Sequence, residues 1–122
     1  MISWATILRG AGLTALFSAA VLLVVVRERR PWVLSVAVAA SALGPVTWNA
    51  ILRATHASRF FTDAPIAVFP VSWQDTGSGV FAVALAAVAL GLGPLRQERS
   101  QRLMLVALLT GAVALAVDVY LY

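Results

Sequence analysis

The chain has 122 residues, of which 61% are hydrophobic and only 11% are charged. Soluble domains are about half apolar and a quarter charged, so this composition excludes an ordinary soluble protein and fits a chain solvated by lipid. The nine basic residues are all arginine and most of them flank apolar runs, which favours a membrane surface over nucleic acid as their partner. The absence of cysteine excludes disulfides and thiolate chemistry.

Four apolar runs follow one another and predict four transmembrane helices. They cover about residues 4–26, 32–52, 77–95 and 103–122. Each is near the ~20 residues that cross the hydrocarbon core as a helix, the form in which every backbone polar group bonds within its own segment. We therefore predict a single all-α integral membrane domain over residues 1–122, a compact antiparallel bundle of four transmembrane helices.

The first run combines a stripe of small residues with one charge. The stripe, which repeats at every fourth position, consists of Thr6, Gly10, Thr14 and Ser18. Small residues let helix backbones approach closely in lipid, where apolarity alone does not drive association. Arg9 lies near the start of this run, and Asp118 lies at a similar depth near the end of the fourth. Because an intramembrane charge is costly when unpaired, we predict a structural ion pair between Arg9 and Asp118, either direct or mediated by the central loop. The alternative for Arg9 is that its long side chain reaches the headgroups.

The segments after the first and third runs are basic. Residues 27–30 hold three arginines and a glutamate, and residues 96–102 hold the same set. The positive-inside bias predicts that both segments lie in the cytoplasm. The lysine-free composition, rich in Ala, Val and Arg, suggests a bacterial source. We expect a multi-pass protein of the plasma membrane with both termini and the central loop outside. We also expect these six arginines to be individually replaceable.

Polar residues gather where the second run ends. Asn49, Arg53 and His56 are spaced by four and three residues, so they share one helical face. Arg59 follows shortly after. Because the planar guanidinium group suits phosphate and carboxylate, this rim predicts a lipid-headgroup or anionic-ligand site; simple contact with lipid phosphates is the alternative.

The central loop, about residues 54–76, is too long for a plain turn. Its apolar stretch 65–73 contains two prolines, which argue against a continuous helix. We predict an ordered loop that is interfacial or partly re-entrant and acts as a lid or as a strap resting on the membrane. At its end, Asp75, Thr76 or Ser78 is expected to cap the third helix. The full predicted ligand- or partner-binding set is Asn49, Arg53, His56, Arg59, Asp63, Trp73 and Asp75.

The candidate groups give little support for catalysis. His56 is the only histidine, and no spacing signature of a metal site or a catalytic triad is present. We expect no catalytic residue, no metal, no cofactor and no nucleic-acid partner. The first hypothesis is a small polytopic membrane protein without enzyme activity: an accessory or assembly subunit, or an outer-face binder of lipid or an anionic ligand. Its partners would be membrane lipids, another membrane protein or a second copy of the chain.

Two other function classes stay open. An oligomeric small transporter or channel would need a polar path, and the spans supply few polar groups for one. A membrane enzyme acting on a lipid-linked substrate would use His56, Asp63 and Asp75 for acid–base chemistry, and would require them to converge on one cleft.

Overall fold

The computed structural model describes residues 2–66 and 68–121 and consists of helices joined by loops. The long helices are α1 (Trp4–Val24), α2 (Pro31–Ala54), α3 (Trp73–Leu92) and α4 (Ser100–Leu121), and a short 3-10 helix, η1 (Ser58–Phe61), lies in the central loop. All four long helices are long and apolar enough to cross a membrane. The predicted all-α, four-span architecture is thereby confirmed at the level of fold and composition.

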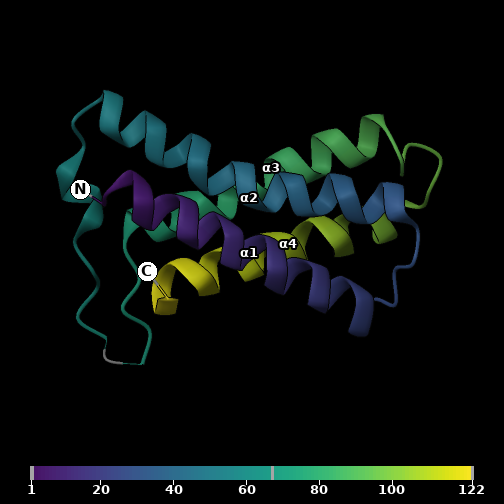
Figure 1. Cartoon of the computed structure of the whole chain (residues 1–122), viewed down its shortest axis with the longest axis horizontal. Coiled ribbons are helices and arrows are strands. Elements are labelled where there is room, and N and C mark those ends of the chain that lie inside the picture. Colours follow the sequence, from purple (N-terminus) through teal and green to yellow (C-terminus); the bar gives the residue numbers. More distant parts are fainter. Residues whose placement is uncertain (1, 67, 122) are drawn as a thin grey trace.

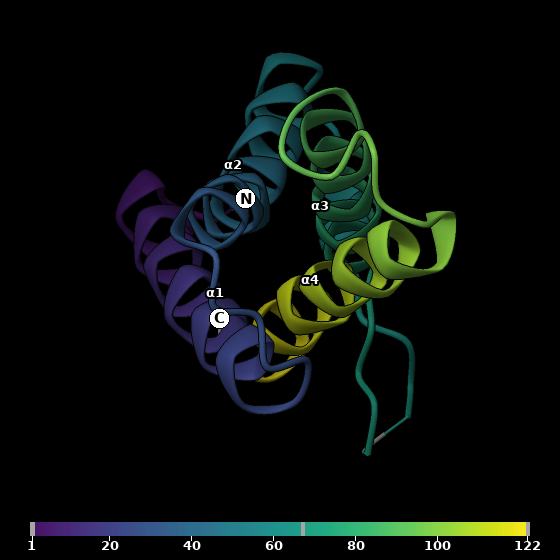
Figure 2. The ribbon, with the colours of Figure 1, turned by 90° about the vertical axis from the view of Figure 1, so that its right-hand side faces the viewer.

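The four helices pack antiparallel in a closed arrangement. Each contacts the next along the chain, and α1 also contacts α4. Figure 1 shows the ends of α1 and α4 nearest the termini on the same side as the central loop, which we call the termini end. Residues 25–30 and 93–99 form the opposite end, which we call the arginine end. Figure 2, viewed from the arginine end, shows the helices surrounding a common axis.

The third helix begins earlier than predicted. It starts at Trp73 instead of Gly77 because Ser72 and Asp75 form a capping box. The Ser72 backbone N–H donates to Asp75 Oδ2 at 2.8 Å, and the Asp75 backbone N–H donates to Ser72 Oγ at 3.2 Å. Two otherwise orphaned donors are satisfied in this way. The cap is therefore Ser72, and Asp75 takes the reciprocal position in the first turn.

The other boundaries shift by a few residues. The first helix ends two residues before position 26, and the second extends past position 52 to Ala54. The third ends at Leu92, before the predicted 95, and the fourth starts at Ser100. The predicted end of the last span at residue 122 lies outside the described residues.

The central loop is tied back on itself and onto α4. The Ala64 N–H donates to the Val71 carbonyl at 2.7 Å, which draws the two arms of the loop together. The Tyr120 hydroxyl donates to the Val68 carbonyl at 2.6 Å, and the Tyr120 ring lies 6.4 Å from the Phe69 ring. In Figures 1 and 2 the loop projects sideways from the termini end of the bundle.

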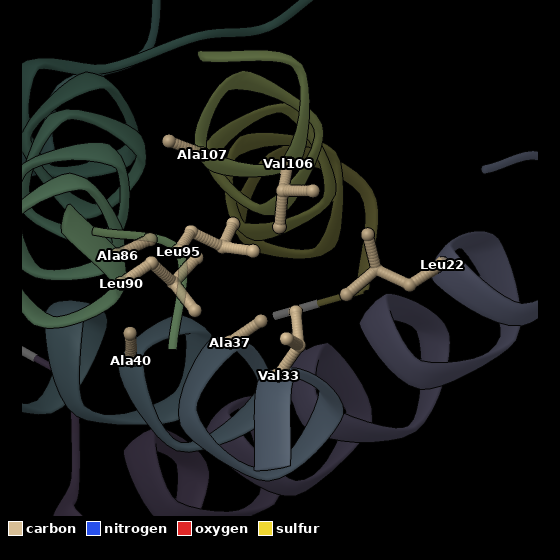
Figure 3. Close-up of a cluster of buried hydrophobic side chains, with 9 residues drawn as sticks. All are labelled: Leu22, Val33, Ala37, Ala40, Ala86, Leu90, Leu95, Val106 and Ala107. Carbon is tan, nitrogen blue, oxygen red and sulfur yellow. The ribbon is translucent and has the colours of Figure 1, made fainter. Parts of the chain in front are cut away.

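The interior changes in character along the bundle axis. At the arginine end, buried apolar side chains from all four helices and the loop after α3 pack together, as Figure 3 shows. This apolar plug consists of Leu22, Val33, Ala37, Ala40, Ala86, Leu90, Leu95, Val106 and Ala107. Toward the termini end the buried residues include the polar side chains Asn49, Gln74, Ser78 and Asp118, so a polar site can form inside the bundle there.

Small residues set the closest approaches between helices. On α1 the members Gly10, Thr14 and Ser18 of the predicted stripe are buried. Between α2 and α3, a Cβ added to Gly44 would lie 2.5 Å from the backbone nitrogen of Ala82. Because backbone cannot yield as a flexible side chain can, this crossing requires glycine.

Candidate functional site

A polar cluster joins three helices inside the termini end. Its centre is the Gln74 side-chain amide, whose Nε2 donates to Asn49 Oδ1 at 3.2 Å, to Asp118 Oδ2 at 3.0 Å and to Ser78 Oγ at 3.4 Å. All four side chains are buried. Buried polar groups are costly unless hydrogen-bonded, and satisfied networks fix one arrangement of the elements that carry them. The polar cluster therefore sets how α2, α3 and α4 meet.

Trp48 fixes the start of α3 against α2. Its Nε1 donates to the Gln74 carbonyl at 3.0 Å, and its ring stacks between Phe60 and Phe81, with centroid distances of 6.0 and 5.2 Å. Gly77 leaves room for this ring, since a Cβ there would collide with it. The first turn of α3 is thus positioned by a hydrogen bond, a stack and a missing side chain.

A pocket of about 330 Å³ lies above this first turn. Its lining comes from both arms of the central loop and from α3: Thr62, Asp63, Ala64, Val71, Ser72, Trp73 and Thr76. We call it the Asp63 pocket. A smaller cavity of about 170 Å³ adjoins it, sharing Asp63 and Ser72 and reaching the buried carboxyl groups of Asp75 and Asp118. Among the described residues that line the two spaces, the charged ones are all acidic.

The structure distributes the predicted binding residues over three environments. Asp63 and Trp73 line the Asp63 pocket, with the Trp73 side chain 69% exposed. Asn49 lies beneath, in the polar cluster, and Asp75 is buried in the capping box and lines the adjoining cavity. Gln74, which sequence reasoning did not select, is the residue that links the cluster. Its spacing of four from Ser78 was the available signal, but only if α3 began before residue 77.

The basic members of the predicted set lie away from the pocket. Arg53 Nη1 donates to the Ile2 carbonyl at 2.9 Å, and its guanidinium carbon lies 5.2 Å from the centroid of the Trp4 ring. Its charge is therefore engaged within the bundle by a hydrogen bond and a cation–π contact. His56 and Arg59 are exposed.

His56 does not share the helical face of Asn49 and Arg53, because α2 ends before it. Its φ of 54° is left-handed, the conformation that closes many helices. The Ala57 N–H donates to the Leu52 carbonyl at 3.0 Å and the His56 N–H donates to the Arg53 carbonyl at 3.3 Å, which is a Schellman motif. The role visible for His56 is thus to terminate a helix.

The two residues of the predicted ion pair differ in environment. Arg9 is exposed on α1, whereas Asp118 is 3% exposed and accepts the Gln74 hydrogen bond. Their pairing stays a prediction.

A second charged cluster, at the arginine end, was not anticipated. Glu28, only 2% exposed, accepts from Arg30 Nε at 2.8 Å and from Arg102 Nη2 at 2.7 Å, and Arg30 also pairs with Glu98. The Arg30 hydrogen bonds, joined by that of Arg102, lower the pKa of Glu28 from its ordinary 4.5 to about 2, against the opposing effect of burial. Arg30 therefore links the two loops of this end through Glu98, and Arg102 links the first of these loops to α4, beyond any part they have in topology.

Comparisons with known protein families, curated proteins and solved structures gave no match. Function must therefore be inferred from the chemistry of the site itself.

Proposed function

We propose that this small four-span membrane protein binds, without transforming it, a ligand that carries a positively charged ammonium group in the Asp63 pocket. The observation that carries the proposal is the pairing of the Asp63 carboxylate with the exposed Trp73 ring in one pocket at the termini end. An aromatic face beside a carboxylate is the combination that attracts ammonium groups. The hydroxyl groups of Thr62, Ser72 and Thr76 add hydrogen-bonding capacity to the same wall.

The negative charge of the Asp63 pocket revises the hypothesis, drawn from the sequence, of an anionic ligand. Arg53 already contacts the Ile2 carbonyl and the Trp4 ring at the start of α1. His56 and Arg59 are not among the pocket's lining residues, whereas Asp63 is. An anion placed in the pocket would therefore face a carboxylate without a facing guanidinium, which is unfavourable.

Binding is a better account than catalysis or transport. A lipid-directed enzyme would need His56 to converge with Asp63 and Asp75, but His56 is exposed beyond the end of α2 and does not line either cavity. A transporter would need a polar path to the arginine end. That half of the described interior is filled by the apolar plug.

Ligand titration of the full chain in detergent micelles tests the proposal. Choline and its uncharged isostere 3,3-dimethylbutan-1-ol would be titrated while the indole N–H resonance of Trp73 is followed. We expect a saturable shift with choline only, weakened about fivefold by Asp63→Asn, since an exposed charge pair is worth up to about 1 kcal/mol. Glu98→Gln, the same change at the arginine end, should bind as the unmodified chain does. Equal shifts with both compounds would show that the pocket does not recognise charge.

We also propose that the arginine end lies in the cytoplasm and the termini end outside the plasma membrane, with the central loop in the outer headgroup region. The six arginines at one end support the orientation. The exposed side chains of Ile66, Val68 and Phe69 support an interfacial loop. Because the chain lacks cysteine, a single cysteine can be introduced at exposed Ser58 or Gln97 and labelled in intact cells with a membrane-impermeant maleimide. Labelling at position 97 but not at position 58 would show the opposite orientation and contradict this proposal.

A further inference from the structure

An apolar groove runs along the lipid-facing side of the bundle between α3 and α4. Its volume is about 520 Å³. The walls include Thr76, Gly79 and Val83 from α3 and Leu108, Gly111 and Leu115 from α4. Apart from the Thr76 hydroxyl at one end, these side chains offer only van der Waals contact. Inside a bilayer, such a groove suits a hydrocarbon chain or the side of another helix.

The groove adjoins the Asp63 pocket. Thr76 lines both spaces, three residues along α3 from Trp73. One molecule with a polar head and an apolar tail can therefore occupy the pocket and the groove together. The charged pocket beside the groove distinguishes the α3–α4 seam from a second apolar groove, between α1 and α4. That second groove is lined by Phe17, Val21, Val113, Ala116, Val117, Tyr120 and Leu121.

The length of the groove selects between the two occupants. From Thr76 to Ala84 it follows α3 over eight residues, or about 12 Å at ~1.5 Å per residue. One leaflet of the hydrocarbon core is about 15 Å deep, and a partner helix crosses the full ~30 Å. The length of the groove thus matches an acyl chain from one leaflet. A transmembrane partner helix would need a contact surface about twice as long as the groove.

Two glycines form the floor of the groove. A Cβ added to Gly79 would lie 3.2 Å from Leu115 Cβ and 3.3 Å from the Gly111 carbonyl oxygen, and one added to Gly111 would collide with the Val83 side chain. The two backbones therefore meet closely beneath the walls. This close seam leaves a furrow above it, bounded by the larger side chains on either side.

We propose that the ligand of the Asp63 pocket is a membrane lipid with an ammonium head group, one acyl chain of which lies in the α3–α4 groove. The inference rests on the proposed function and names the class of ligand. The negative mouth complements the ammonium head, and the groove accepts the chain. The lipid comes from the leaflet on the side of the termini end.

Photo-crosslinking of lipid in nanodiscs tests where the chain lies. The full-length protein would be reconstituted with phosphatidylethanolamine or phosphatidylcholine carrying a diazirine on one acyl chain, and crosslinked peptides mapped by mass spectrometry. We expect crosslinks concentrated on α3 and α4 between residues 76 and 84 and between 108 and 115. The two lipids distinguish primary from quaternary ammonium heads.

A matched pair of variants separates the groove from the general lipid-facing surface. Ala112 is exposed and lines the groove, so Ala112→Leu should fill it and lower groove crosslinking about tenfold. Ala89 is exposed on α3 but is not a lining residue, so Ala89→Leu should leave crosslinking unchanged. Labelling spread evenly over the four helices, or unaffected by Ala112→Leu, would overturn the inference.

The inference and the proposed function can fail separately. Saturable choline binding without groove crosslinks would leave the pocket as an ammonium site and remove the acyl chain. Equal groove labelling by a phosphatidylglycerol probe, whose head lacks an ammonium group, would overturn the inference that the ligand is an ammonium lipid, whereas the choline titration alone decides whether the Asp63 pocket binds ammonium groups.

Discussion

Replacement of Glu28 by glutamine is expected to destabilise the arginine end strongly. The amide keeps the shape of the side chain but removes the charge on which Arg30 and Arg102 converge. The pKa of Glu28 is about 2 instead of 4.5, and each pH unit between those values is worth about 1.4 kcal/mol, so the ion pairs contribute about 3 kcal/mol. Glu28 is only 2% exposed, but its partners Arg30 and Arg102 are 47% and 30% exposed, so solvent screening lowers the net contribution towards about 2 kcal/mol.

The contribution has a defined pH dependence. The folded-state pKa of Glu28 is lowered, so its stabilisation is fully present above pH 4.5 and is lost as the pH falls from 4.5 towards 2. Thermal unfolding in detergent micelles, followed by circular dichroism, measures it. At pH 7 Glu28→Gln should lower the midpoint by on the order of 10 °C, and the variant should lose less stability than the unmodified chain on acidification.

Glu98→Gln provides the control for this measurement. Glu98 is 37% exposed and pairs only with Arg30 among the ion pairs described. A partly exposed pair of this kind is worth under about 1 kcal/mol, so its loss should shift the midpoint by a few degrees at most. If the two variants unfold at the same temperature, or lose stability equally between pH 5 and 3, the buried ion-pair cluster does not stabilise the fold as reasoned.

Three further substitutions test the packing and the helix ends by the same unfolding measurement. Gly44→Ala should cost about 1–3 kcal/mol because its Cβ meets the backbone of α3, whereas Gly12→Ala, with open space around it, should be neutral; equal effects would contradict the close crossing. Gln74→Leu should cost about 1–3 kcal/mol by removing the amide that donates to Asp118, and an unchanged midpoint would mean that the polar cluster is dispensable. His56→Gly should raise stability by up to about 1 kcal/mol by relieving the left-handed backbone, and a lower midpoint would refute that assignment.

The four spans could be predicted from the sequence because hydropathy and length constrain them directly. Their ends were less certain, since hydropathy does not register a cap. The apolar signal begins near Gly77, but the Ser72–Asp75 capping box starts α3 one turn earlier and carries Gln74 into the bundle. That shift turned a presumed loop residue into the centre of the polar cluster.

The candidate site could be predicted only in part. Trp73 was predicted as a contact for the ligand or partner and Asp63 as an acid that orients the loop, and both line one pocket. The basic face of Asn49, Arg53 and His56 assumed that α2 continues, and the Schellman motif ends it first. Glu28 gave no sequence signal of burial, because its partner Arg102 lies 74 residues away and only the tertiary fold brings the two together.

The polar contacts at both ends of α4 have a consequence for the order in which the protein folds during synthesis. Helices α1 to α3 precede α4 in the chain, so during synthesis Glu28 meets Arg30 at once but waits for Arg102, and Gln74 waits for Asp118. Entry of α4 into the bilayer would complete both contacts in one step. A chain whose α4 is not seated in the bundle would therefore leave Glu28 without Arg102 at the arginine end and Gln74 without Asp118 at the termini end.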